Sequence, residues 1–146
     1  MAGNDTFQLA FDYWRKRGVA VLPPADDDEI ERTFAQLKQP LSQDVRRLYS
    51  TTNGFADGDC DGVWSLWSLN RILEENKSRN SRSLWFADFL ISSHMYCIQY
   101  STPETSAVFI DHNNSADPPY EIAESVEQFL RKYLTNPDGV EAFDLS

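Results

Sequence analysis

The fold of this chain can be inferred first from one segment, Leu48-Tyr49-Ser50-Thr51-Thr52-Asn53-Gly54-Phe55. Leu48 and Tyr49 continue the apolar spacing of a helix that begins upstream. Asn53 and Gly54 tolerate the left-handed backbone in which many helices end. The segment therefore predicts the last turns of an amphipathic helix, followed by a turn into a sheet.

Three helices are predicted in the first third of the chain. Residues 5–17 carry apolar side chains at helical spacing, with Asn4 or Asp5 available to cap the first amides. A second helix is expected to begin near Asp26, because three acidic residues then follow where the helix start is positive. Ser42 is expected to cap the third helix, which runs into the segment quoted above.

The middle of the chain is rich in β-branched and aromatic residues and is interrupted by turn formers. Strands are expected over residues 63–69, 84–91, 94–100 and 107–111. One helix is expected over residues 69–76, and a final helix from about residue 120 to 134. Helices, then strands, then a helix predict a single α+β domain over residues 1–146, in which N-terminal and C-terminal helices pack a twisted antiparallel sheet.

The charge of the chain is strongly acidic and unevenly distributed. The formal net charge is −10, and residues 101–146 alone hold nine acidic and two basic side chains. Such a surface repels phosphate backbones, so we expect no nucleic-acid partner. It would attract a basic protein partner and steer its approach. The alternative is that the acidity only keeps the protein in solution.

The two cysteines and the hydropathy pattern bear on the compartment. Two thiols, Cys60 and Cys97, do not make a disulfide framework in a chain of 146 residues. The N-terminus lacks the basic and apolar regions of a signal peptide, and no apolar run has the length of a membrane span. We therefore expect a cytoplasmic protein without a membrane contact.

The acidic loop Asp57-Gly58-Asp59-Cys60-Asp61-Gly62 resembles the start of a calcium-binding EF-hand loop. The pattern then fails, because Ser68 stands where a bidentate Glu is required and the next segment reads as a strand. His94 and His112 could form a metal pair, but they lack a ligand spacing such as one helical turn. We expect neither a metal nor another cofactor.

Signals of catalysis are weak throughout the sequence. It contains no Gly-x-Ser-x-Gly nucleophile turn, no glycine-rich phosphate loop and no dinucleotide motif. Cys97 and His94 are three residues apart on an expected strand, so they should face opposite sides of the sheet. We expect a protein that is not an enzyme, and a small calcium- or metal-dependent enzyme stays open as an alternative.

Three motifs, in this order, resemble the SUKH superfamily of Smi/Knr-like domains over residues 27–135. The first is the Leu48–Gly54 part of the quoted segment, with its Tyr and Asn-Gly. The second is a Trp-rich strand that leads into the helix step Leu69-Asn70-Arg71-Ile72. The third is the final helix, with Ser125 and Phe129-Leu130. Strand-like segments at 86–91, 95–98 and 108–112 lie between them, as in that superfamily.

This resemblance implies a protein-binding scaffold without accepted catalytic residues. Many bacterial members are immunity proteins that bind secreted toxins, so the resemblance implies neutralisation of a toxin, here a basic one such as a nuclease. A regulatory adaptor, as in fungal cell-wall control, is the alternative within the superfamily. The identity of the partner and the oligomeric state stay open.

The acidic loop and the tryptophans that follow it are the expected contact residues. Loops vary in sequence while the scaffold stays fixed, so partner specificity is expected in such a loop. Tryptophan is also common at protein interfaces, although large apolar side chains are more often buried, and the alternative is that both tryptophans belong to the core. The expected contacts are Asp57, Asp59, Asp61, Trp64 and Trp67.

Overall fold

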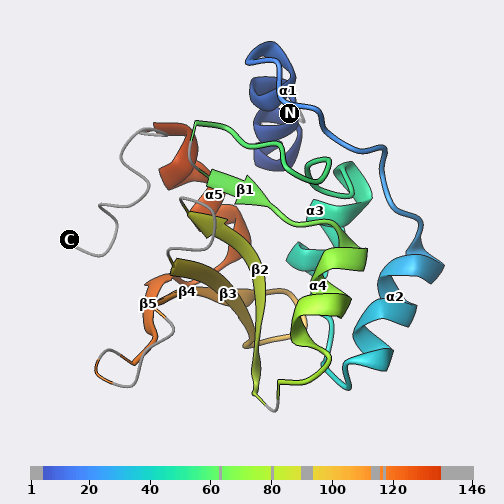
Figure 1. Ribbon diagram of the computed structural model, residues 1–146, viewed down its shortest axis with the longest axis vertical. Helices are drawn as coiled ribbons and strands as arrows, with labels where there is room; N and C mark the ends of the chain where they lie inside the picture. The colour runs from blue at the N-terminus through green and yellow to red at the C-terminus, as the bar shows by residue number, and fades with distance from the viewer. Residues whose placement is uncertain are drawn as a thin grey trace.

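A computed structural model of the chain describes residues 5–62, 64–79, 81–89, 94–112, 116 and 118–135 (Figure 1). The helices are α1 (Thr6–Lys16), α2 (Asp27–Gln36), α3 (Gln43–Thr51), α4 (Leu69–Asn76) and α5 (Val126–Thr135). The strands are β1 (Trp64–Leu66), β2 (Ser83–Phe89), β3 (His94–Tyr100), β4 (Ser106–Asp111) and β5 (Tyr120–Ala123). None of the described helices has the length and apolar character that crossing a membrane requires.

The five strands form one sheet in the order β1-β2-β3-β4-β5, and every neighbouring pair is antiparallel. Each strand therefore pairs with the next one along the chain, as hairpin connections favour. In the centre, Cys97 of β3 lies opposite Trp85 of β2 and Phe109 of β4. The prediction of an α+β domain with an antiparallel sheet is confirmed.

The core lies between the sheet and the helices. α5 packs its aromatic side chains onto the sheet, with the Phe129 ring centre 5.7 Å from Tyr96 and 6.3 Å from Phe86. α1 packs on α5 and α3, whereas α2 and α4 lie next to each other and α4 contacts β2 (Figure 1). These contacts place α4 and the loop before β1 at one edge of the sheet.

The three N-terminal helices occur where the sequence predicts them. Asp5 caps α1 by accepting a hydrogen bond from the Phe7 amide at 2.9 Å. Asp26 caps α2 in the same way, with the Glu29 amide at 2.8 Å. Ser42 occupies the capping position of α3, but its side chain makes no capping hydrogen bond and instead donates to the Asp44 carboxylate at 2.6 Å.

The Tyr–Asn–Gly segment after α3 holds the junction between β1 and α4. The Tyr49 hydroxyl donates to the Trp67 carbonyl at 2.8 Å, and the Asn53 side chain accepts from the Leu69 amide at 2.9 Å. Gly54 has a φ of +91°, and a Cβ there would lie 2.6 Å from the Trp67 carbonyl oxygen. Only glycine fits this backbone and this contact, which explains the local sequence.

The C-terminal region differs from the prediction. The expected helix from residue 120 begins only at Val126, because Tyr120–Ala123 pairs with β4 as strand β5. Ser125 then begins the helix, since its hydroxyl accepts a hydrogen bond from the Gln128 amide at 3.0 Å. The Ser-x-x-Gln pattern of residues 125–128 is a known sequence mark of a helix start.

The expected strand over residues 63–69 is also shorter than predicted. β1 ends at Leu66, and Ser68 already caps α4 by accepting a hydrogen bond from the Arg71 amide at 3.2 Å. The expected strand over 84–91 corresponds to β2, while residues 63, 90 and 91 lie outside the described residues.

Candidate functional site

Asp61 is buried, contrary to the expectation that it contacts a partner. Its side chain is paired with the Arg17 guanidinium and accepts a hydrogen bond from the Tyr133 hydroxyl. Tyr133 in turn accepts a hydrogen bond from the Trp14 indole at 2.9 Å. Asp61 therefore ties the loop to α1 and α5, because a buried carboxylate is stable only when it is paired.

The same surroundings change the acidity of Tyr133. Burial raises the pKa of the Tyr133 hydroxyl, and its hydrogen bond to Asp61 raises it further. The hydroxyl therefore stays protonated as a donor to Asp61 through the physiological range. The contact therefore fixes the loop to α5.

Trp64 and Trp67 are also in the core, so the expectation that they contact a partner does not agree with the structure. Each is 1% exposed. The Trp64 ring centre lies 4.9 Å from that of Tyr133 and 5.9 Å from that of Trp14. Large aromatic side chains with such neighbours stabilise the interior and present no area to a second protein.

Asp59 and Asp57 differ from Asp61 in exposure. Asp59 is half-buried, and its side chain accepts hydrogen bonds from the Ala20 and Cys60 amides. Asp57 is exposed. The three carboxylates therefore lie in different surroundings and do not converge on one point. Across the described ranges, no group of three or more His, Cys, Asp or Glu side chains could hold a metal ion.

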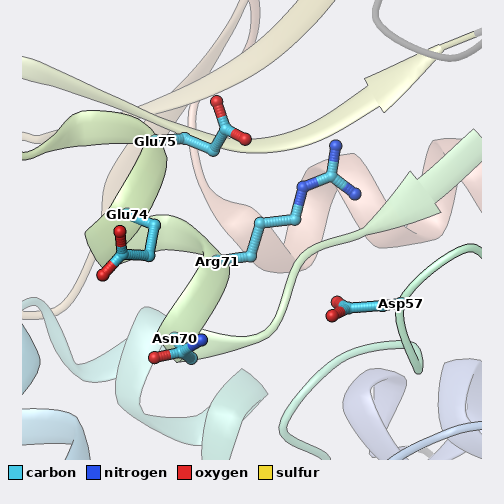
Figure 2. Close-up of a pocket in the computed structure, with 5 residues that line it drawn as sticks. All are labelled: Asp57, Asn70, Arg71, Glu74 and Glu75. Carbon is cyan, nitrogen blue, oxygen red and sulfur yellow. The ribbon is translucent and has the colours of Figure 1, made fainter.

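Asp57 instead faces helix α4 across a surface hollow (Figure 2). Four of the lining residues come from that helix, and Figure 2 shows Asp57 opposite them on its loop. The hollow has a volume of about 370 Å³, a size usual for small-molecule sites, but its lining is charged where those sites are mainly apolar. The lining residues are Asp57, Asn70, Arg71, Glu74 and Glu75.

Arg71 supplies the positive charge among the residues that line this hollow, which we call the acidic hollow. Two buried side chains fix its position. Its guanidinium lies 3.1 Å from the buried Asp88 carboxylate and 4.3 Å from the centre of the Trp67 ring. A cation placed over an indole face and paired with a carboxylate is well fixed. The Trp67 side chain therefore contributes to the hollow by positioning Arg71.

The remaining carboxylates give the acidic hollow its charge. Glu74 and Glu75 are exposed on α4, and Glu74 accepts an ion-pair contact from Lys77 at 2.8 Å. Exposed pairs of this kind are weak and screened by salt, so they leave a carboxylate available to a partner. With three carboxylates and one guanidinium, the lining has a net negative charge, which would attract a basic side chain of another protein.

The sequence alone did not single out α4 as part of this site. Its residues 70, 71, 74 and 75 are spaced as neighbours on one helical face, which is the signal that could have grouped them. Their meeting with Asp57 depends on the Tyr49–Trp67 and Asn53–Leu69 hydrogen bonds, which bring the loop and the helix start together.

Comparison with known proteins identifies the type of domain. Residues 24–132 match the model of the SMI1 / KNR4 family (SUKH-1), in agreement with the resemblance over 27–135. Among curated proteins, no similar sequence was found.

Proposed function

This chain belongs to the SMI1 / KNR4 family (SUKH-1), and from that membership we propose that it acts by binding another protein. The domain is non-catalytic in this proposal, as the family generally is. Its most specific form is an immunity protein that neutralises a secreted toxin by direct binding. The toxin would be basic, and a nuclease is a suitable example because it must bind phosphates itself.

The acidic hollow carries the proposal. Its lining combines exposed carboxylates from two segments, Asp57 on the loop and Glu74 and Glu75 on α4, with the guanidinium of Arg71, which Asp88 fixes. Both segments are anchored to the core, so a partner would meet a preorganised surface. Preorganisation reduces the entropy lost on binding.

The overall charge of the chain also favours a basic partner. A net charge of −10 attracts a basic protein over a longer range than any single contact. Complementary charge raises the association rate and disfavours wrong partners, which suits neutralisation of a harmful protein. The complex would therefore weaken as salt screens the charges.

The alternative within the family is a regulatory adaptor. An adaptor could use the same acidic hollow, and the two functions differ in the identity of the partner. A basic toxin supports the immunity function, and a regulatory protein of the same cell supports the adaptor.

The proposal is tested by capturing partners from an extract of the source cells. The wild type is compared with the hollow variant Asp57→Asn/Glu74→Gln/Glu75→Gln, which removes three carboxylates and keeps side-chain size. The control variant Glu104→Gln/Glu121→Gln/Glu124→Gln removes three exposed carboxylates, one from the turn between β3 and β4, one from β5 and one just after β5. The captured chains are identified by mass spectrometry at low and high salt.

We expect a stoichiometric basic protein with the wild type and with the control variant, and its loss with the hollow variant and at high salt. Equal capture by all three proteins would contradict docking at the acidic hollow. Capture of a non-basic regulatory protein would favour the adaptor.

A further inference from the structure

Two histidines that are far apart in the sequence lie opposite each other in the sheet. β3 and β4 pair in register, and the last pair recorded is Met95 with Asp111. Continuing this antiparallel register by one residue places His94 opposite His112. Directly opposite residues put their side chains on the same face with Cβ atoms about 5 Å apart.

The two imidazole rings meet in the structure. Their centres are 5.1 Å apart, with an angle of 57° between the ring planes. Two imidazoles that each bind one ion at about 2.1 Å, in tetrahedral geometry, have ring centres about 5 Å apart. The separation of the two ring centres therefore leaves room for both imidazoles to bind one metal ion.

Neighbouring aromatic rings hold the pair in place. Phe89 stacks on His94 with ring centres 4.8 Å apart and an angle of 15°. Tyr120 lies 6.1 Å from His112 on the other side. The four rings come from β2, β3, the residue after β4, and β5, and their contacts restrain both imidazoles. His94 is 8% exposed, while His112 is half-buried and offers the route of entry.

We propose that His94 and His112 form a binding site for a divalent metal ion of the zinc, nickel or copper type. Imidazole nitrogen suits these ions, whereas magnesium and calcium require oxygen ligands. Two protein ligands leave the remaining coordination positions to water, which agrees with the lack of any three-ligand group in the described part of the chain. Copper should bind more tightly than nickel or zinc.

The site is independent of the acidic hollow and of the proposed partner binding. A bound ion would fix the first residue of β3 to the residue that follows β4. Because the ion binds the folded chain, it would raise thermal stability in a concentration-dependent way. Two ligands alone give modest affinity, so the effect should grow over the micromolar range of zinc.

The chain has only two histidines, which makes the test direct. The full chain without a histidine tag is labelled with ¹⁵N, and the ring signals are followed while zinc chloride is added. We expect both rings to shift together and to saturate at one zinc per chain. His112→Gln and His94→Gln should each abolish the saturable shift of the ring that remains.

The control variant Cys60→Ser removes the exposed thiol, another zinc ligand type, and should bind zinc like the wild type. The melting temperature provides a second measurement: zinc should raise it for the wild type and for Cys60→Ser, but for neither histidine variant. A shift confined to one ring, or zinc stabilisation that persists in His112→Gln, would overturn the proposal. So would unchanged ring signals at a hundredfold excess of zinc.

Discussion

The Asp44 carboxylate accepts a hydrogen bond from the backbone amide of Val126 at 2.9 Å, so the first turn of α3 caps the first turn of α5. The same carboxylate accepts from the Ser106 amide at 3.1 Å, where β4 begins. Asp44 is buried, with 6% of its surface exposed. One side chain therefore joins three elements that are distant in sequence.

Replacing Asp44 by Ala should destabilise the domain strongly. The change leaves the buried Val126 and Ser106 amides without their acceptor, and each unsatisfied group costs about 1–3 kcal/mol. We expect the free energy of unfolding to fall by about 3 kcal/mol in urea titrations. Asp26→Ala is the control, because Asp26 caps α2 from an exposed position and should cost about 1 kcal/mol. Equal losses for the two variants would contradict the role of Asp44.

Gly54→Ala tests the contact at the β1–α4 junction. The new methyl would meet the Trp67 carbonyl oxygen at 2.6 Å, in a backbone with φ of +91°. Gly58→Ala is a matched control, with φ of +84° and nothing within 4 Å of the added Cβ. We expect a loss of about 1 kcal/mol for Gly58→Ala from the left-handed backbone alone, and at least about twice that for Gly54→Ala. The comparison is made by thermal or urea unfolding, and similar losses would contradict the steric argument.

The two thiols should differ in reactivity. Burial, and then the charge of Asp111, raise the pKa of Cys97 to about 12. The reactive thiolate of Cys97 is therefore scarce in the folded protein, while Cys60 is exposed. At mildly alkaline pH we expect a thiol reagent to modify one cysteine per chain quickly, and both after denaturation. Rapid modification of both cysteines in the folded protein would show that Cys97 is accessible. So would rapid modification of the folded Cys60→Ser variant, in which Cys97 is the remaining thiol.

Stability should decrease in alkaline solution. Burial raises the pKa of Tyr49 as well as that of Cys97. Well below the unfolded-state pKa values, about 8.5 for cysteine and about 10 for tyrosine, both groups are protonated in the folded and in the unfolded chain, so they add no pH dependence. Above its own unfolded-state pKa, each group loses its proton first in the unfolded chain and lowers the free energy of unfolding by about 1.4 kcal/mol per pH unit. Urea midpoints measured from pH 8 to 11 should therefore fall, and a constant midpoint would contradict these pKa shifts.

Local sequence signals were sufficient for most of the fold. The capping residues Asp5 and Asp26 located two helix starts correctly, because caps depend on a few neighbouring residues. Helix α3 ends at Thr51 with Thr52 in extended backbone, just before Asn53, and the left-handed Gly54 shapes the turn that follows. Tyr120–Ala123 was assigned to a helix in error. Its apolar spacing is compatible with either structure, and pairing with β4 makes it a strand.

The candidate site depends on contacts between segments that are distant in the sequence. The spacing of residues along the chain does not reveal such contacts. Asp61 reads as a loop carboxylate, yet Arg17 and Tyr133 bury it. Trp67 reads as a surface anchor, yet it lies beneath Arg71. Asp57 remains a predicted contact residue, and its α4 partners in the acidic hollow became apparent only from the folded chain.

The most direct test of the account is the affinity of the purified captured partner for the wild type and for Asp57→Asn/Glu74→Gln/Glu75→Gln, measured by titration calorimetry at low salt. We predict a loss of about tenfold or more, equivalent to about 1.4 kcal/mol, with no loss for Glu104→Gln/Glu121→Gln/Glu124→Gln. The same affinity for all three proteins would contradict the claim that the acidic hollow is the docking surface.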